Sequence, residues 1–389
     1  MHNVNLPTPP PIYLDHHATT PVDPRVVAVI SDVMTTSFGN ANSVEHVYGE
    51  VAADQISIAR REVGELVGAE PEGVHFTSGS TESIWLAIAH AVASRRKKQL
   101  RVALSTVEHK AVQDAVKFYE QQGDVIVRWI PVDEKARLDM TVLKAICQEG
   151  IDLVCVMAAN NEVGTIYPIA DVVRLLAFAG AKALVDATQA VGHFPLTACE
   201  WGIAYLTLSA HKIYGPKGIG ALVVPAGFRF GSGEWTVPGK REGTPNVPGI
   251  VGFGKACQLL RCEMSDDEPR MEAQRNRLQE LLVANIKGLV VNGDIQHRLA
   301  NNLHVSVPSV PNDVVIARLR HRVALSSGSA CSSATQTPSH VLQAMGLSEP
   351  LQEGSLRIGI GKFTTDDEIS RAAMYISEVV VSTQSALGR

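Results

Sequence analysis

The sequence predicts an α/β protein whose mainly parallel sheet is covered by helices on both faces. Up to about residue 264, short apolar runs alternate with amphipathic helical patterns, as in a parallel sheet that is buried on both sides. Polar residues end the runs 74–77, 153–157, 183–186 and 205–208. Because the carboxyl ends of parallel strands lie at one edge of a sheet, we expect polar residues that are far apart in the sequence to meet there.

Helical patterns follow the strands at 82–94 and 110–120, where apolar residues recur at helical spacing. After about residue 265 the pattern changes, because an acidic stretch precedes a long polar helical pattern that starts at Met271. Shorter strand patterns follow it. We therefore predict a large domain over residues 21–264 and a smaller α+β domain over residues 265–389.

Composition and charge limit the class of protein. At 389 residues, with 45% hydrophobic and 19% charged residues, the chain has the composition of a globular protein with a large core. A formal net charge of -5 offers no basic surface for nucleic acid, so we expect no direct nucleic-acid binding. The start of the chain lacks a signal-peptide pattern, and no apolar run is long enough to span a membrane. We therefore expect a cytoplasmic protein that does not bind a membrane.

The six cysteines argue against several kinds of site. They form no dense framework, and none belongs to a Cys-x-x-Cys pair. A disulfide scaffold, a zinc knuckle and an iron–sulfur ligand set therefore have no support. We expect no metal site and mostly free thiols.

Lys212 stands directly after an apolar strand pattern and before the glycine-rich turn 213–218. A lysine at the carboxyl end of a buried strand could hold an aldehyde cofactor covalently. The alternative is a solvated surface lysine, which is what most lysines are. The local pattern leaves both possibilities open.

The run 78–81 could bind a phosphate group. It lies between a strand pattern and a helical pattern, so backbone amides and hydroxyls could surround a dianion at the positive end of the helix. A plain helix-capping turn is the alternative. The glycine-rich motifs of dinucleotide-binding and triphosphate-binding loops do not occur in the chain.

The sequence around Lys212 resembles the segment that carries the cofactor lysine in the cysteine desulfurases of the NifS and IscS group, which are fold-type I enzymes that use pyridoxal phosphate. Nearly the whole chain takes part in this resemblance. It implies the fold-type I architecture, in which residues 1–20 return to join the smaller C-terminal domain. Further motifs occur in the family's order at residues 13–21, 76–83, 108–112, 160–164, 186–189, 241–244, 326–331 and 357–365.

The resemblance implies that pyridoxal phosphate is attached to Lys212, that Gln189 bonds the 3-oxygen of the ring and that His109 stacks on the ring. Asp186, which ends a strand, could pair with the ring nitrogen and keep it protonated, or it could be only a helix cap. The cofactor-binding set that the resemblance implies is Gly79, Ser80, Thr81, His109, Asn161, Asp186, Gln189, Ser209, His211, Lys212 and Thr244. Because Thr244 reaches the phosphate from a second subunit in the family, a homodimer is implied.

The resemblance also implies how substrate is held and where sulfur goes. Asn161 and Arg357 are the substrate-binding residues, and the planar fork of Arg357 suits a carboxylate. Cys331 lies in a loop of about 325–337 that is rich in small polar residues, which we expect to be mobile and exposed. A cysteine is usually buried and inert, but the family has its persulfide-forming cysteine at this position.

The implied reaction converts L-cysteine to L-alanine and transfers the sulfur as a persulfide to Cys331 and then to an acceptor protein. Lys212 is both anchor and base, and His109 moves protons in the thiol steps. The acceptor stays open between an iron–sulfur scaffold and a thiolation enzyme, since iron–sulfur cluster assembly, tRNA thiolation, nitrogenase maturation and DNA phosphorothioation all use such enzymes. The alternatives are a selenocysteine lyase or another β-eliminating lyase, neither of which requires Cys331, and a non-catalytic docking subunit.

Three features depart from the family pattern. Trp85 stands where the group usually has an asparagine, one turn after the phosphate-binding threonine. The glycine-rich approach to the intersubunit motif is replaced at 233–239. Few residues follow 363–365, so we expect the C-terminal extension that grips a scaffold partner to be missing.

Overall fold

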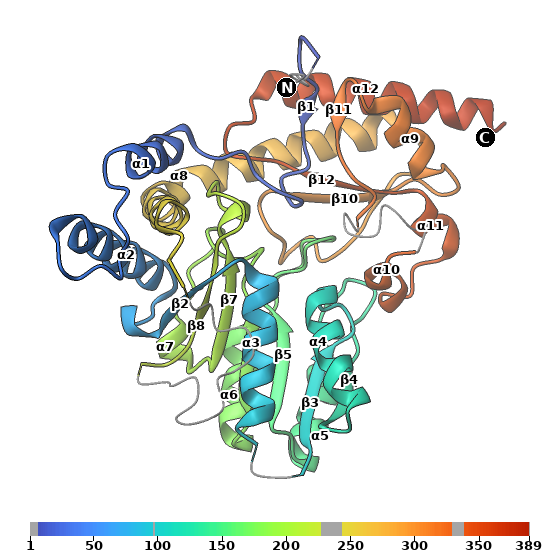
Figure 1. The fold of residues 1–389 in the computed structure, drawn as a ribbon. Helices are drawn as coiled ribbons and strands as arrows, with labels where there is room; N and C mark the ends of the chain where they lie inside the picture. Colours follow the sequence, from blue (N-terminus) through green and yellow to red (C-terminus); the bar gives the residue numbers. More distant parts are fainter. Residues whose placement is uncertain (1–6, 96–97, 227–242, 329–337, 389) are drawn as a thin grey trace.

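The computed structural model describes residues 7–95, 98–226, 243–328 and 338–388. These residues form two lobes (Figure 1). The large lobe is built on a seven-stranded sheet, and the small lobe contains the C-terminal helix. No helix in these ranges is both long enough and apolar enough to cross a membrane.

The sheet of the large lobe is almost entirely parallel. Only β8 among its strands runs against its neighbours β2 and β7, so β2 and β7 point in the same direction. The carboxyl ends of β2, β5, β6 and β7 therefore share one edge, as the sequence predicts. The strands in spatial order are β2 (Val74–Thr77), β8 (Gly220–Val223), β7 (Tyr205–Ser209), β6 (Lys182–Asp186), β5 (Leu153–Met157), β3 (Leu100–Ser105) and β4 (Val125–Ile130).

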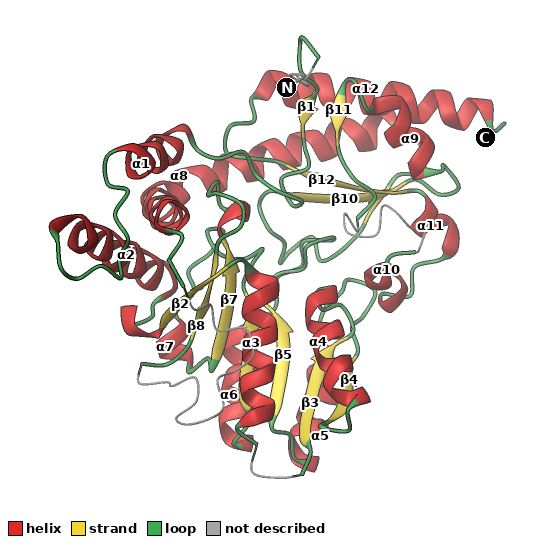
Figure 2. Cartoon of the chain, viewed as in Figure 1, coloured by secondary structure: helices red, strands yellow, loops and turns green. Residues whose placement is uncertain are grey.

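Helices cover both faces of the sheet, because alternate strand residues point to opposite sides. Leu153 and Cys155 of β5 pack in one apolar cluster with helix α3 (Ser80–Ala93) and helix α4 (Lys110–Gln121). Val154 and Val156 pack in a second cluster on the other face. Figure 2 shows α3 in front of the sheet and α6 behind it.

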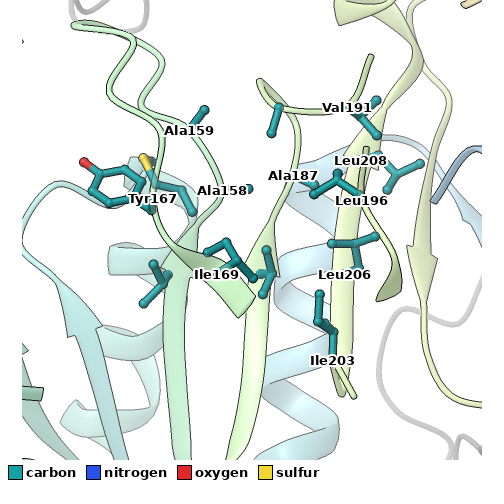
Figure 3. Close-up of a cluster of buried hydrophobic side chains, with 14 of the residues drawn as sticks. Ala158, Ala159, Tyr167, Ile169, Ala187, Val191, Leu196, Ile203, Leu206 and Leu208 are labelled. Carbon is teal, nitrogen blue, oxygen red and sulfur yellow. The ribbon is translucent and has the colours of Figure 1, made fainter. Parts of the chain in front are cut away.

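The second cluster is the larger core of this lobe. Figure 3 shows Leu206 and Leu208 of β7 beside Ile169 and Ala187 in this cluster. The other helices described in this lobe are α1 (Pro24–Thr35), α2 (Val47–Val67), α5 (Met140–Glu149), α6 (Ile169–Ala179), α7 (Ala198–Trp201), and the 3₁₀ helices η1 (Pro71–Gly73) and η2 (Ala210–Lys212).

The small lobe combines two short sheets with helices. Strands β12 (Ser355–Gly359), β10 (Asn302–Ser306) and β9 (Val290–Val291) form an antiparallel sheet in that order. The N-terminal strand β1 (Ile12–Tyr13) pairs in parallel with β11 (Val323–Ala324). Strand β1 thus lies in the small lobe. Its helices are α9 (Asn312–Leu319), α11 (Glu349–Glu353) and α12 (Asp366–Ala386).

Helix α10 (His340–Ala344) contacts the large lobe although it follows small-lobe strands in the sequence. Val341 and Leu342 pack in the large-lobe core, whereas Leu303 and Ile358 form a separate small-lobe core. The segment that follows residue 337 is thereby fixed to the lobe that carries Lys212.

One helix, α8 (Val247–Asn285), runs through both lobes. The sequence predicts a helix that starts at Met271 after an acidic break, and this prediction is wrong, because α8 is continuous through Pro269. Two of the acidic side chains have ion-pair partners: Glu268 pairs with His193, which lies outside the helix, at 2.7 Å, and Asp267 pairs with Arg270 of the same helix at 2.7 Å. The acidic stretch is therefore compatible with a continuous helix.

Candidate active site

Lys212 ends the 3₁₀ helix η2, which follows directly after β7. Its ammonium group donates hydrogen bonds to the backbone carbonyls of His17 and Ala18, the latter at 3.0 Å. The N-terminal segment therefore lies against the lysine. This contact joins residues nearly two hundred positions apart at the predicted edge of the sheet.

Asp186 is the last residue of β6 and is buried. One carboxylate oxygen, Oδ1, accepts hydrogen bonds from the Thr188 amide at 3.0 Å, from the Thr188 hydroxyl, and from the Thr207 hydroxyl at 3.2 Å. The other oxygen, Oδ2, has no hydrogen-bond partner within the described ranges. The carboxylate is thus fixed in orientation and keeps one oxygen for a cationic partner.

The start of α3 offers free donors. Gly79 is the helix N-cap, and the amides of Ser80, Thr81 and Glu82 find no acceptor among the residues that the structure describes. A Cβ atom added at Gly79 would lie 3.6 Å from the Ser209 hydroxyl, so the end of β7 lies beside this helix start. Amides at a helix N-terminus bind phosphate groups.

Close backbone packing holds this arrangement in place. A Cβ atom added at Gly220 would lie 2.6 Å from the Cα of Gly79 and 2.5 Å from the carbonyl oxygen of Leu208. A larger residue at 220 would therefore push β8 away from the turn at Gly79. Thr244 lines a cavity of about 240 Å³ with Thr77 and Glu82, next to the same helix start.

His211 is turned toward the N-terminal segment, where its Nδ1 atom lies 3.1 Å from the hydroxyl oxygen of Thr19. Burial, with the nearby charges of Lys212 and Lys217, lowers the pKa of His211 to about 4. The ring is therefore neutral near pH 7. It can donate one hydrogen bond and accept one without adding charge beside Lys212.

His109 is the N-cap of α4, where its Nδ1 accepts a hydrogen bond from the Ala111 amide at 3.2 Å. The neutral ring therefore carries its proton on Nε2. Burial lowers the pKa of His109, while the charge of Asp186 raises it and that of Lys212 lowers it. His109 follows the carboxyl end of β3, and Asp186 and Lys212 lie at the carboxyl ends of β6 and β7, so the three residues share one edge of the parallel sheet.

Gln189 is held by a histidine to which the sequence analysis gave no role. Its Oε1 lies 3.1 Å from Nδ1 of His17, and its Nε2 donates to the His17 carbonyl at 3.0 Å. Burial, followed by the charge of Arg357, lowers the pKa of His17 well below its usual value. The neutral ring donates through Nδ1 to Gln189 and accepts from Asn302 at Nε2. One N–H of Gln189 is left for a ligand.

Arg357 lies on β12 and is almost wholly buried. It donates to the backbone carbonyls of Asn161 at 3.1 Å and Gly328 at 2.7 Å, and it pairs with Asp15 at 3.0 Å. The structure therefore brings together both predicted substrate-binding residues. The contact with Asp15 was not predicted, because no local pattern links residues more than three hundred positions apart.

Cys331 lies outside the described residues, but the residues on both sides of residues 329–337 border the site. Gly328 bonds Arg357, and the Ser339 hydroxyl donates to Glu162 at 2.6 Å. The other cysteines divide into two groups. Cys147, Cys155 and Cys257 are buried with a raised pKa, and Cys199 and Cys262 are exposed.

Glu108 directly precedes His109 and has no role predicted from the sequence. It is wholly buried, and its Oε1 accepts hydrogen bonds from the Ser105 hydroxyl at 2.6 Å and the Met157 amide at 2.9 Å. Burial raises the pKa of Glu108 to about 8. Nothing in the sequence around Glu108 indicates that its carboxyl group is buried.

Comparisons with known proteins agree with this arrangement. The family "Aminotransferase class-V" matches residues 12–372. The cysteine desulfurase IscS of Anaeromyxobacter sp. (strain Fw109-5) is 42% identical over 375 residues, which cover 95% of this chain and 92% of that protein. The chain belongs to the cysteine desulfurase family.

Other members of the family are also similar to this chain over most of its length. The cysteine desulfurase IscS of Escherichia coli O139:H28 (strain E24377A / ETEC) is 40% identical over 92% of this chain and 90% of its own length. A solved NifS-like protein has a TM-score of 0.86 at 31% identity, covering 96% of this chain and 100% of that one. The structure named "SspA in complex with cysteine" has a TM-score of 0.76 at 29% identity, covering 91% and 100%. The predicted family, fold class, enzyme class and cofactor, pyridoxal phosphate, are confirmed.

The described residues fit pyridoxal phosphate. Lys212 supplies an amine, Asp186 keeps Oδ2 for the ring nitrogen, and the amides that begin α3 are free to bind a phosphate. Each of the three chemical groups of the cofactor would thus find a suitable partner at one edge of the sheet. The individual role of each residue stays a prediction.

Proposed function

We propose that this enzyme converts L-cysteine to L-alanine and transfers the sulfur to Cys331, from which an acceptor protein takes it. The observation that carries the proposal is the meeting of Lys212, Asp186 and His109 at the edge where Arg357 contacts Gly328, three residues before Cys331. In this proposal the residues for proton transfer and substrate binding lie together, and Gly328, the last described residue before Cys331, is bonded to one of them.

Each residue of the site has a separate part in the proposed reaction. Bound pyridoxal phosphate supplies a ring that withdraws electrons from the substrate's Cα. Arg357 binds the substrate carboxylate, and the Lys212 amine takes the Cα proton and later returns it. Asp186 holds a negative charge against the ring nitrogen. His109, with its proton on Nε2, is suited to move protons for the thiol steps.

The sulfur step uses the protein's own thiolate. The Cys331 thiolate attacks the substrate sulfur, so that an S–S bond forms on Cys331 while the substrate's Cβ–S bond breaks. The electron pair of that bond stays with the carbon skeleton. The carbon skeleton then takes up protons and leaves as alanine. The persulfide moves onward by thiol exchange with a cysteine of the acceptor.

The same proposal includes a homodimer in which Thr244 reaches the partner's site. Five apolar side chains where α1 ends and α2 begins are each more than half exposed, and the rings of Phe38 and Tyr48 lie 5.4 Å apart. An apolar surface of this kind on a soluble protein favours association with a second copy. The five side chains are Met34, Phe38, Val44, Val47 and Tyr48.

We further propose an iron–sulfur scaffold or a thiolation enzyme as the acceptor and the cytoplasm as the compartment. The described cysteines are all free thiols, which supports a reducing compartment. Trapping the persulfide form and isolating the protein that becomes disulfide-linked to it would identify the acceptor.

The test of the reaction is persulfide labelling with mass mapping after one turnover with L-cysteine. Label on Cys331 is expected, and Cys331→Ser should keep cofactor binding while sulfur transfer stops, because a serine hydroxyl is neither ionised at neutral pH nor able to accept sulfur. Label on Cys155 or Cys262 instead would contradict the proposal. Full turnover by the serine variant would favour the lyase alternative, and no turnover by the wild type would favour the docking subunit.

A further inference from the structure

The Arg357 side chain is almost completely buried, and three of its five N–H groups donate hydrogen bonds within the protein. Its side chain is only 2% exposed. Nη1 donates to the carbonyl oxygens of Asn161 at 3.1 Å and Gly328 at 2.7 Å, which uses both of its N–H groups. Nη2 donates to Oδ1 of Asp15 at 3.0 Å.

Two N–H groups of Arg357 are left over. Nε is buried and has no hydrogen-bond partner in the described part of the chain, and Nη2 carries a second N–H. Nε and Nη2 are adjacent nitrogens on one side of the planar group, which is the arrangement that binds a carboxylate through two parallel hydrogen bonds. A substrate carboxylate on this side would lie next to the carboxylate of Asp15.

Asp15 is held in place by its backbone. Leu14, just before it, donates to the Ala324 carbonyl at 2.9 Å and accepts from the Gly359 amide at 2.8 Å. The Tyr13 hydroxyl donates to the Asp15 carbonyl at 3.2 Å. Strand β1 and its continuation are thus bonded on both sides, which fixes the backbone of Asp15 beside Arg357.

We propose that Asp15 is a resting counter-ion of Arg357 that weakens substrate binding, because the substrate carboxylate has to share the guanidinium with it. This inference rests on the proposed function, in which Arg357 binds the carboxylate of L-cysteine. Asp15 is a positioning residue in this scheme: it holds Arg357 paired and oriented while the site is empty, and it sets the substrate concentration at which the enzyme works.

The other titratable groups around Arg357 do not take over this role. Burial and the charge of Arg357 lower the pKa of His304 to about 3 and that of His17 well below its usual value, so both rings are neutral. Burial raises the pKa of Glu162, which accepts its hydrogen bond from Ser339. Within the described ranges, Asp15 is the one carboxylate in an ion pair with Arg357.

Two opposite effects distinguish a counter-ion from a residue that only supports the fold. Asp15→Asn removes a negative charge from beside the bound substrate, so KM should fall. The same change leaves a buried arginine without its ion-pair partner, so the protein should unfold at a lower temperature. A purely structural residue would lower stability and leave KM unchanged or raise it.

The experiment compares Asp15→Asn, Asp15→Glu and Asp152→Asn in the cofactor-loaded enzyme. Asp152 pairs with Arg101 at 3.0 Å before the start of β5, at the opposite end of the sheet, so its variant controls for the loss of an ion pair. We expect Asp15→Asn to lower KM for L-cysteine by about tenfold, with kcat changed less, as the loss of one nearby like charge predicts. Asp15→Glu keeps the charge and should restore KM, and Asp152→Asn should lower Tm without changing KM.

A second measurement needs no turnover. Propionate, a carboxylate without an amine or thiol, should stabilise the cofactor-loaded Asp15→Asn protein against heat at about tenfold lower concentration than it stabilises the cofactor-loaded wild type. If Asp15→Asn does not fold, Asp15→Ser gives the same comparison. A KM that is unchanged within twofold, or higher, in an active neutral variant overturns the inference while the proposed function stands. Failure of the wild type to form alanine overturns the proposed function itself.

Discussion

Asp186→Asn tests the electrostatic centre of the site without disturbing its geometry. The Oδ1 atom of Asp186 accepts all three hydrogen bonds that hold the side chain. An asparagine can keep its own oxygen toward these donors and place its NH2 group where Oδ2 lies. The fold and the orientation of the side chain should therefore survive, and the change is the loss of one negative charge.

The size of the effect follows from burial. Asp186 is 6% exposed, so solvent screens its charge only weakly, and a full charge at such a centre is worth on the order of 3 kcal/mol, or about a hundredfold in rate. Thr207→Val is the matched control, because it removes one donor to Asp186 and no charge. Its cost should be about 1 kcal/mol, or roughly fivefold.

The assay is single-turnover formation of alanine by enzyme that is saturated with cofactor, with the bound cofactor measured by absorbance. Loss of charge at Asp186 should also lower the pKa of His109, because Asp186 raises that pKa in the native protein. The pKa can be followed in the pH dependence of turnover. A rate for Asp186→Asn within threefold of the wild type, at full cofactor occupancy, would refute the role of Asp186 as partner of the ring nitrogen.

Three further predictions test other parts of the site. Lys212→Ala should abolish alanine formation and the borohydride-sensitive absorbance of the bound cofactor, and retention of both would show that another group is the anchor. Glu108→Gln should raise Tm relative to the wild type more at about pH 9 than at about pH 6. Native Glu108 has a pKa raised to about 8, so ionisation of this buried carboxyl costs the wild type stability as the pH rises through that value; equal shifts at both pH values would contradict this. Phe38→Asp should lower the molar mass measured by light scattering toward that of one chain. The control is Phe178→Asp in α6, which should leave the molar mass unchanged although Phe178 is 87% exposed. A dimer that persists in the Phe38 variant would exclude the surface around Phe38 as the dimer interface.

The sequence predicted the parts of the site that depend on strand direction and local pattern. Asp186 and Lys212 follow apolar runs, and in a parallel sheet such runs end at one edge whatever their separation in sequence. His109 was placed at a helix start because apolar spacing begins just after it, and it caps α4. These inferences needed only neighbouring residues.

Contacts that depend on the packing of distant segments were not predictable in this way. Asp15 meets Arg357 because β1 returns to the small lobe, and His17 meets Gln189 for the same reason. The antiparallel strand β8 was not predicted, because a four-residue apolar run does not indicate whether the strand is parallel or antiparallel to its neighbours. The helix boundary at Met271 was wrong because proline and acidic residues favour a break locally, whereas packing against both lobes keeps α8 helical.

The continuity of α8 has a consequence for how the protein folds. The helix is 39 residues long, which at 1.5 Å per residue is about 58 Å. Phe253 and Cys257 in its first half complete one core, and Leu278 and Leu282 in its second half complete the other. If one lobe unfolded alone, the half of α8 that packs in that lobe would lose its contacts, so the unfolding of the two lobes is thermodynamically coupled. Heat should therefore melt both lobes in a single cooperative transition, and a fragment cut within α8 should leave each piece with an open core.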